Sequence, residues 1–262
     1  MPLIADTHVH LYPCYNLNCA FRCLSRNLSR LAGVNGSNAV PIAVLTERHD
    51  CRFFAQLRDG LRIPDDPSVT IEKSAEPNCI AINCDGTELH LFAGRQINTL
   101  ERIEILALTV DADIPDGLQA RDVIIRILDE GGVPVVSWAP GKWFARRGHV
   151  VRELIQNAES GTLLVGDTTL RPVGWGTPSL MQNASRQGLS IIAGSDPLPF
   201  AGEERYMGRY ASHIDASFDV DGPVSSLRSA LRDGRVVEQV GHRCQLIPWA
   251  LRLWRNARAK QR

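Results

Sequence analysis

Residues 3–10 read Leu-Ile-Ala-Asp-Thr-His-Val-His, a short apolar run that passes into polar side chains at alternate positions. The apolar residues 3–5 predict a buried β-strand. Side chains along an extended strand alternate between its two faces, so we expect His8 and His10 to point the same way, with Asp6 on their side. Two imidazoles on one face can bind a single cation, and an aspartate from a distant strand could complete the site. This stretch therefore predicts a metal site at the end of the first strand.

Beyond residue 10 the chain alternates short apolar runs with amphipathic helical stretches. Strands separated by helices of this length indicate parallel βα units. The predicted strands lie at 39–46, 79–83, 88–93, 103–108, 133–137, 162–165 and 190–193, and the predicted helices at 18–32, 53–61, 118–130, 149–159, 178–187, 223–233 and 248–261. We expect one domain over residues 1–262, with a core of about 1–222 and a C-terminal helical segment of about 223–262.

The composition is that of an ordinary globular protein. The 262 residues include 29 basic and 29 acidic side chains, a balance that argues against nucleic acid and membrane surfaces as partners. The first residues do not have the pattern of a signal peptide, and no apolar run is long enough for a membrane span, so we expect a cytoplasmic protein. Arg252 begins a run of cations without acidic residues. We expect this run to form a solvated terminal helix. The alternative is that it binds an anionic partner.

The seven cysteines contain no Cys-x-x-Cys pair. Neither a disulfide framework nor a thiolate zinc site is therefore expected. Cys14 follows the histidine pair closely and could supply a further ligand to a metal there.

Polar and other distinctive side chains follow several of the predicted strands, at the ends where α/β folds gather their chemistry. They are Glu47, His49 and Asp50 after the strand at 39–46, Arg95 and Gln96 in the third region, Trp138-Ala139-Pro140 after 133–137, Asp167 after 162–165, and Asp196 after 190–193.

These elements resemble the motifs of the polymerase and histidinol phosphatase (PHP) family. The resemblance covers about the first 200 residues and is carried by residues 6–10, 45–50, 93–96, 135–140 and 194–196, in the order of that family. It implies an α/β fold, a distorted seven-stranded (β/α) barrel of the PHP type, with up to three metal ions at its mouth. It also implies hydrolysis of phosphate esters, in which the metals generate hydroxide and neutralise phosphoryl oxygens.

The chain departs from the family pattern at three positions. Gln96 stands where the family has a metal-bridging glutamate, and a neutral amide supplies no charge. Ala139 and Leu198 stand where the family has histidines. The resemblance then leaves His8, His10, Gln96 and Asp196 as one metal site. We expect one or two divalent ions (Zn, Mn or Fe) rather than three.

Further roles are expected for charged residues near the strand ends. His49 and Asp50 could transfer protons. Arg48, Arg95 and Lys142 could hold a small anionic substrate. The loop at 197–210 could cover the site as a lid or pack over the end of the barrel.

Three functions fit the sequence. The first is a metal-dependent hydrolase, a phosphoesterase acting on a small phosphorylated substrate. The second is a catalytically degenerate PHP-like barrel with a ligand-binding or structural role, which the losses at Gln96, Ala139 and Leu198 favour. The third is an amidohydrolase-type enzyme. The strand ends at 137–140 and 165–167 argue against it, because they offer no histidine.

Overall fold

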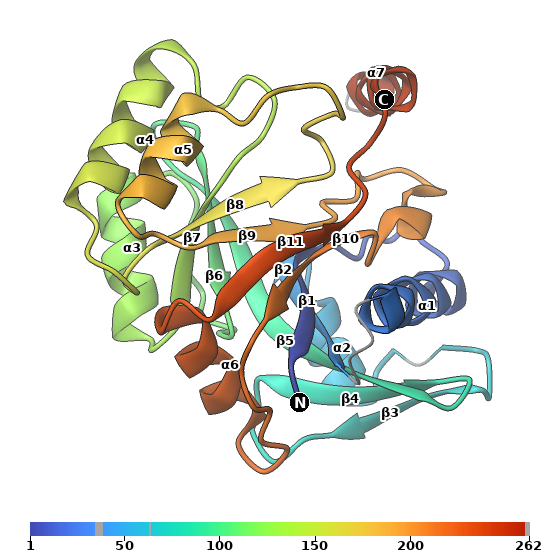
Figure 1. Ribbon diagram of the computed structural model, residues 1–262. Helices are drawn as coiled ribbons and strands as arrows, with labels where there is room; N and C mark the ends of the chain where they lie inside the picture. Colours follow the sequence, from blue (N-terminus) through green and yellow to red (C-terminus); the bar gives the residue numbers. More distant parts are fainter. Residues whose placement is uncertain (35–38, 63, 260–262) are drawn as a thin grey trace.

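One mixed β-sheet, nearly closed on itself, organises the molecule (Figure 1). The computed structural model describes residues 1–34, 39–62 and 64–259. The continuous path through the sheet is β11-β10-β1-β2-β5-β6-β7-β8-β9, and β4 pairs with β5 and β3 off this path. The strands are β1 (Leu3–Val9), β2 (Val40–Glu47), β3 (Val69–Lys73), β4 (Cys79–Cys84), β5 (Thr87–Asn98), β6 (Glu104–Leu108), β7 (Val133–Ser137), β8 (Leu164–Thr168), β9 (Ile191–Gly194), β10 (Tyr210–Ile214) and β11 (Val236–Gly241).

The last strand of this path, β9, approaches β1, which is third from the other end. The Thr7 hydroxyl donates to the carbonyl of Ala193 at 3.0 Å, and the Asp196 amide donates to the carbonyl of His8 at 2.8 Å. The sheet is therefore an α/β barrel in outline, as expected. It differs from the expected seven-stranded form because the path has nine strands. Two additional C-terminal strands lie on the other side of β1. Strand β10 pairs antiparallel with β1, and β11 pairs antiparallel with β10.

The direction of β6 also differs from a simple repeat of parallel units. It runs antiparallel to both β5 and β7. The connection from β5 to β6 is a tight turn in which the Thr99 amide donates to the carbonyl of Ile103. A turn this short cannot carry a parallel crossover, which needs a dozen or more residues.

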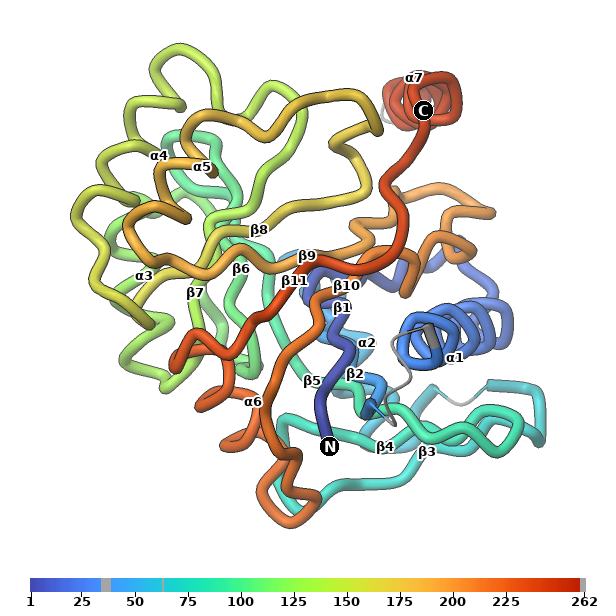
Figure 2. The backbone as a smooth tube through the Cα atoms, viewed as in Figure 1, coloured from blue at the N-terminus to red at the C-terminus, as the bar shows by residue number. Residues whose placement is uncertain are grey.

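Helices cover the outside of the sheet (Figures 1 and 2). In Figure 2, α1 lies on the right beside β1 and β2, while α3, α4 and α5 lie together on the left. The helices are α1 (Leu17–Val34), α2 (Phe53–Arg58), α3 (Ala120–Asp129), α4 (Ala145–Asn157), α5 (Ser179–Arg186), α6 (Pro223–Arg232) and α7 (Leu246–Ala259), with a 3₁₀ turn η1 (Glu203–Tyr206). No helix among the described residues combines the length and the apolar character needed to cross a membrane.

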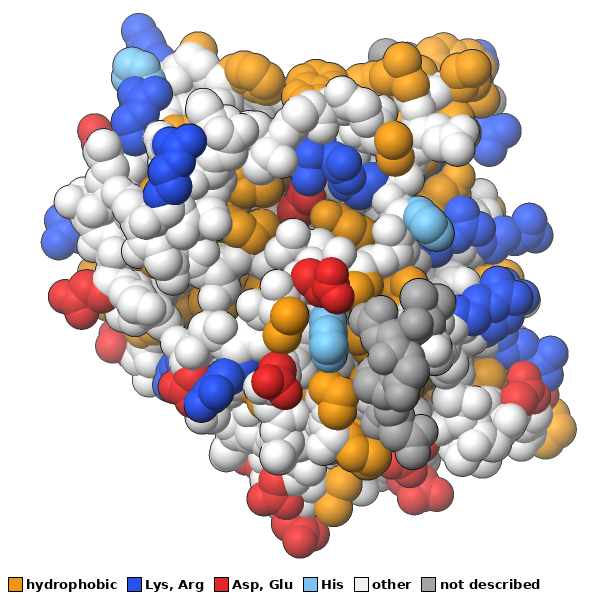
Figure 3. Space-filling view, viewed as in Figure 1, with side chains coloured by type: hydrophobic (Ala, Val, Ile, Leu, Met, Phe, Trp, Pro, Cys, Tyr) orange, Lys and Arg blue, Asp and Glu red, His pale blue; other side chains and the backbone are white. Residues whose placement is uncertain are grey.

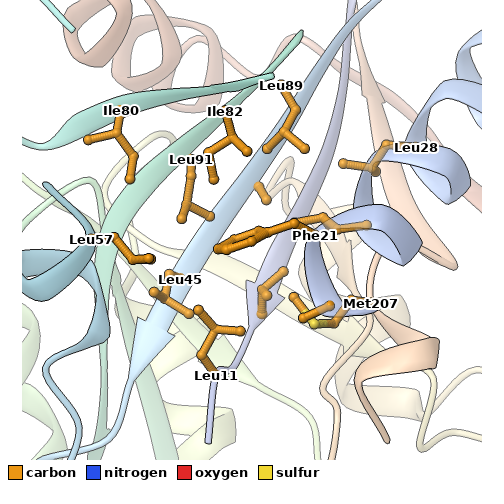
Figure 4. Close-up of a cluster of buried hydrophobic side chains, with 14 of the residues drawn as sticks. Leu11, Phe21, Leu28, Leu45, Leu57, Ile80, Ile82, Leu89, Leu91 and Met207 are labelled. Atoms are coloured by element: carbon orange, nitrogen blue, oxygen red, sulfur yellow. The ribbon is translucent and has the colours of Figure 1, made fainter. Parts of the chain in front are cut away.

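Three clusters of buried apolar side chains form the core. One lies inside the sheet, with Leu3 and Ala5 of β1 among its members. A second lies between the sheet and α1, where Figure 4 shows Phe21 and Leu28 facing Leu45 and Leu91. The third lies under α3, α4 and α5. Alternate residues of each strand thus fill the barrel or support a helix, and the strand ends are left to present polar groups.

The C-terminal segment corrects one expectation. The helix expected at 248–261 is α7, although residues 260 and 261 lie outside the described residues. Arg252 was expected on a solvated helix, and it is only 3% exposed. Its guanidinium donates to the Glu203 carboxylate, with the shortest contact at 2.6 Å, because α7 packs back onto the loop after β9. The charge run of α7 is therefore solvated only in part.

Candidate metal centre

Three buried side chains converge where β1 and β9 end. The Asp196 carboxylate oxygen Oδ1 lies 3.7 Å from His8 Nε2 and 3.6 Å from His10 Nε2. One possible ligand atom from each residue lies within 4.8 Å of the others. Two imidazoles and one carboxylate form the mixed nitrogen and oxygen set that first-row divalent cations bind. This group is a possible metal-binding site.

The backbone around the group explains how three distant residues meet. The pairing of β1 with β2 shifts register between Asp6 and Val9, which turns the end of β1 relative to its start. A side chain on Gly194 would collide with the backbone and Cβ of His8, so this glycine allows β9 to approach β1 closely. Asp196 then adopts a positive φ of 47°, a conformation that aspartate tolerates better than most residues. The close approach and the turn together aim the carboxylate at the histidines.

Two further side chains contact His8. Gln96 Oε1 lies 3.0 Å from His8 Nε2, and the Ser137 hydroxyl lies 3.3 Å from Nδ1. An imidazole that binds a cation through one nitrogen is held in place by a hydrogen bond at the other. Ser137 is placed to accept that bond, while Gln96 offers a carbonyl oxygen on the cation side. Nothing in the sequence pattern singled out Ser137, although it ends the strand at 133–137.

The electrostatics of the group favour a cation. Burial lowers the pKa of His10, so its imidazole favours the neutral state in which a nitrogen lone pair is free to bind metal. Burial alone would raise the pKa of Asp196, but the neighbouring His8 and His10 outweigh it and hold this pKa below its ordinary value. A neutral imidazole and an ionised carboxylate are the states that metal ligands need.

The geometry also fits the size of a metal ion. Donors held about 2.0–2.1 Å from a tetrahedral zinc ion lie roughly 3.3 Å apart. The separations of 3.6 and 3.7 Å from Asp196 to the two histidines are slightly wider.

Asp6 does not face this group, contrary to the expectation from strand alternation. Its carboxylate accepts backbone N–H bonds from His8, Ser195 and Gly208 at 2.8–3.2 Å. The register shift that follows Asp6 breaks the period-two pattern, so Asp6 and His8 no longer share a face. Asp6 instead joins β1 to the segments before and after η1.

The other residues expected at the site are spread around it. Arg48 is the best placed, because its charge contributes to lowering the pKa of the neighbouring His10. Arg48 also pairs with Asp50 at 3.1 Å. Neither Asp50 nor His49 belongs to the three-residue group, and the His49 side chain is 64% exposed and lies 3.4 Å from Asp116. The structure thus does not bring the two expected proton-transfer residues to the histidine pair.

Two of the expected anion-binding residues have structural partners. Arg95 is buried and donates to the carbonyl of Cys51 at 3.1 Å, which holds the segment after β2. Lys142 pairs with Glu104 at 3.3 Å. Cys14 is exposed and is not a member of the three-residue group.

Apolar packing occupies the positions where histidines were noted as missing. Ala139 and Leu198 are each 7% exposed. Leu198 packs in the same apolar cluster as Trp138. The loop at 197–210 is also fixed, because the Tyr15 hydroxyl donates to the carbonyl of Leu198 at 2.6 Å and the Leu198 amide donates to Glu203 at 3.1 Å. This loop packs over the end of the barrel in the structure.

Glu47, at the end of β2, makes stability depend on pH. Its carboxylate accepts the backbone N–H groups of Phe53 and Phe54 at the start of α2. Burial raises the pKa of Glu47 from 4.5 to about 7. The folded state therefore binds a proton more tightly than the unfolded state, and the contribution of Glu47 to stability falls as pH rises from about 4.5 to 7.

We expect Glu47→Gln to flatten the dependence of Tm on pH between 5 and 7.5, by roughly a few degrees across that range. Thermal unfolding at several pH values, followed by circular dichroism, measures this. Glu153→Gln is the matched control, because Glu153 is exposed at the surface of α4. An unchanged pH profile in Glu47→Gln would show that the buried carboxyl does not titrate in this range.

Comparisons with known proteins give the fold but no family. No protein-family model matches the chain, and no curated protein matches it. Among solved structures, PsfC from Pseudomonas syringae PB-5123 is similar with a TM-score of 0.59 and 13% identity, over 99% of this chain and 98% of PsfC. The lesion-specific endonuclease PfuEndoQ from Pyrococcus furiosus is similar with a TM-score of 0.54 and 12% identity, over 92% of this chain and 59% of PfuEndoQ. Both identities are far below 25%, so these likenesses show a shared fold and no shared role.

The endonuclease neighbour overturns one expectation. Balanced charge had argued against nucleic acid as a partner, and that exclusion is wrong, because a protein with a similar fold is an endonuclease. Net charge sums over the whole chain and carries no information on where the charges gather.

Proposed function

We propose that this chain is a metal-dependent hydrolase of phosphate esters with a reduced metal centre. The observation that carries the proposal is the convergence of His8, His10 and Asp196, whose ligand atoms lie within 4.8 Å of one another in a buried position. The fold that the chain shares with the endonuclease PfuEndoQ and the resemblance of its strand-end motifs to the PHP family support the same reaction class. Zn, Mn and Fe are the metals that suit this ligand set.

Each residue has a defined role in this proposal. His8, His10 and Asp196 would hold the metal, and Gln96 would offer a fourth oxygen. A bound divalent cation would supply a nucleophile at neutral pH and neutralise charge on the phosphoryl group. Arg48 would attract the phosphate, since its guanidinium can donate two parallel hydrogen bonds to it. His49 and Asp50 stay candidates for proton transfer at the rim.

Metal content and turnover test the proposal together. The protein is purified without chelator, its metals are measured by mass spectrometry, and hydrolysis of p-nitrophenyl phosphate and bis(p-nitrophenyl) phosphate is followed with added Zn²⁺, Mn²⁺ or Fe²⁺. The two substrates separate monoesterase from diesterase activity. We expect about one bound metal per chain and turnover that a chelator abolishes. A protein without metal, whose Tm does not respond to divalent cations, would contradict the proposal.

A degenerate barrel that binds a ligand without hydrolysing it is the second candidate. The apolar burial of Ala139 and Leu198 favours it, because these positions can no longer hold further metals. Metal binding without turnover on either substrate would favour this candidate. Among the described residues at the ends of β7 and β8 there is no histidine that would favour an amidohydrolase-type site.

Gln96 allows a test by gain of function. We expect Gln96→Glu to tighten metal binding about tenfold, since a second carboxylate would lie beside His8 at the cation side. Isothermal titration with Mn²⁺ or Zn²⁺ measures the affinity, and the double variant Gln96→Glu with Ala139→His should raise the number of bound metals. Gln96→Leu, which has no oxygen, is the matched control and should not tighten binding. Equal affinity in Gln96→Glu and the unaltered protein, with both folded, would argue against a metal next to Gln96.

A further inference from the structure

A pocket of about 840 Å³ with several basic side chains lies away from the metal centre, between α1, η1 and the start of α7. Its lining includes Arg26 and Arg30 from α1, Arg209 before β10, and His242 and Arg243 after β11. The lining contains no aspartate or glutamate and none of the metal-ligand candidates. In a chain with equal numbers of basic and acidic side chains, such a gathering of one sign is a local exception.

These arginines lack acidic partners. Within residues 1–34, 39–62 and 64–259, none of the four arginines lies in an ion pair. The residues outside those ranges include no aspartate or glutamate side chain. Arg209 instead lies over the ring of Tyr206 at 4.7 Å, and Arg243 donates to the carbonyl of Trp175 at 3.4 Å. Their charges are therefore available to an anion.

The backbone fixes the positions from which these cations project. The side-chain amide of Asn27 donates to the carbonyl of Met207 at 2.8 Å, and a side chain on Gly208 would collide with the carbonyl of Leu24. These contacts hold α1 against the segment after η1. On the other side, the His242 amide donates to the carbonyl of Arg209 at 2.9 Å. The pocket is thus built between elements that are joined by hydrogen bonds.

Helix stabilisation does not account for this arrangement. Arg26 and Arg30 lie in the second half of α1 but before its last turn, where the helix dipole would favour a cation. Arg209 and Arg243 come from the ends of β10 and β11 and gain nothing from that dipole. Figure 3 shows Lys and Arg side chains gathered along the right-hand side, where α1 lies in Figure 1. Cations from separate elements facing one cavity indicate a ligand with more than one negative charge.

We propose that this pocket binds a small phosphorylated compound of nucleotide size. Guanidinium groups match phosphate oxygens with paired hydrogen bonds, and several of them can hold a di- or polyphosphate. A volume of about 840 Å³ lies within the range of small-molecule sites, roughly 300–1,000 Å³. The inference goes beyond the proposed hydrolase, because the pocket shares no residue with the metal centre.

Titration with ADP and with inorganic pyrophosphate tests the pocket. The experiments use the unaltered protein and Asp196→Asn, which removes the contribution of the metal centre. We expect both probes to bind both proteins, and Arg26→Ala with Arg30→Ala to weaken binding about tenfold or more. The control is Arg121→Ala with Arg126→Ala, which removes the same charge from two exposed positions on α3 and should leave the affinity unchanged.

Several results would overturn the proposal. One is no binding of either probe, and another is equal weakening by the control pair. Loss of binding in Asp196→Asn alone would assign the probes to the metal centre instead. A single-stranded oligonucleotide of twelve residues serves as a further arm. If it binds through Arg26 and Arg30 while ADP does not, the phosphates come from a polynucleotide and the nucleotide-sized ligand is wrong.

Discussion

Asp196→Asn is expected to weaken divalent-metal binding about 100-fold or more and to abolish metal-dependent hydrolysis. The carboxylate is the only anionic group among the three candidate ligands, and it lies within 3.7 Å of both histidine nitrogens. Asparagine keeps the volume and one oxygen but removes the charge, and two orders of magnitude in affinity correspond to about 2.7 kcal/mol. Asparagine also tolerates the positive φ at this position, so the fold should survive.

Isothermal titration with Zn²⁺ and Mn²⁺, with Tm measured alongside, gives the affinity. Asp50→Asn is the matched control, because this carboxylate lies after β2 with half of its side chain exposed and is not in the group. Its metal affinity should stay within a factor of about two, as expected for a surface substitution. If turnover falls in Asp50→Asn while metal binding stays, the residue has the proton-transfer role. Equal metal affinity in Asp196→Asn and the unaltered protein would show that the metal, if any, lies elsewhere.

The histidine pair shows what a local pattern can predict. His8 and His10 were expected on one face because strand side chains alternate, and both face Asp196 in the structure. The same rule fails for Asp6, two residues earlier, because the register of β1 against β2 shifts between them. Such a shift depends on how β1 meets β2 and β9, which the residues of β1 alone do not encode.

The additional strands β10 and β11 show how far the fold can be predicted from local sequence patterns. The α/β class and many of the elements could be predicted from alternating apolar runs, whereas the pairing of β10 and β11 alongside β1 could not. The β11 residues Val236–Gly241 have no alternation of buried and exposed positions, because all of them are exposed or half-buried. Only their long-range pairing with β10 makes them a strand, and that contact is invisible to a local pattern.

The distribution of charge shows that function, too, depends on contacts that a whole-chain sum does not contain. The whole-chain balance of 29 against 29 argued against anionic polymers, yet it says nothing about Arg26, Arg30, Arg209 and Arg243 gathering around one pocket. Arg26 and Arg30 on α1 lie more than 170 positions before Arg209 and Arg243 in the sequence. Their common location follows from the packing of α1 against the segment after η1, which is a tertiary property.

Arg252 on α7 carries the other large expected effect. It is 3% exposed, and its guanidinium donates to Glu203 at 2.6–3.0 Å and to the Thr169 hydroxyl at 3.0 Å. It also lies 4.1 Å from the centre of the Tyr206 ring. We expect Arg252→Ala to lower the free energy of unfolding by about 3–5 kcal/mol, because the buried Glu203 carboxylate loses its counter-charge.

The double variant Arg252→Ala with Glu203→Gln separates this cost from the loss of packing. Removing both charges leaves no uncompensated ion, so the double variant should be more stable than Arg252→Ala alone. Arg255→Ala, at an exposed position on the same helix, should change the free energy of unfolding by less than about 0.5 kcal/mol. Urea denaturation followed by tryptophan fluorescence measures all three. If Arg252→Ala is no less stable than Arg255→Ala, α7 does not dock on the segment after β9.

The docking of α7 would also support the metal centre, because Arg252 donates to the backbone carbonyl of Asp196 at 3.4 Å. We therefore expect Arg252→Ala to lower metal affinity as well as stability.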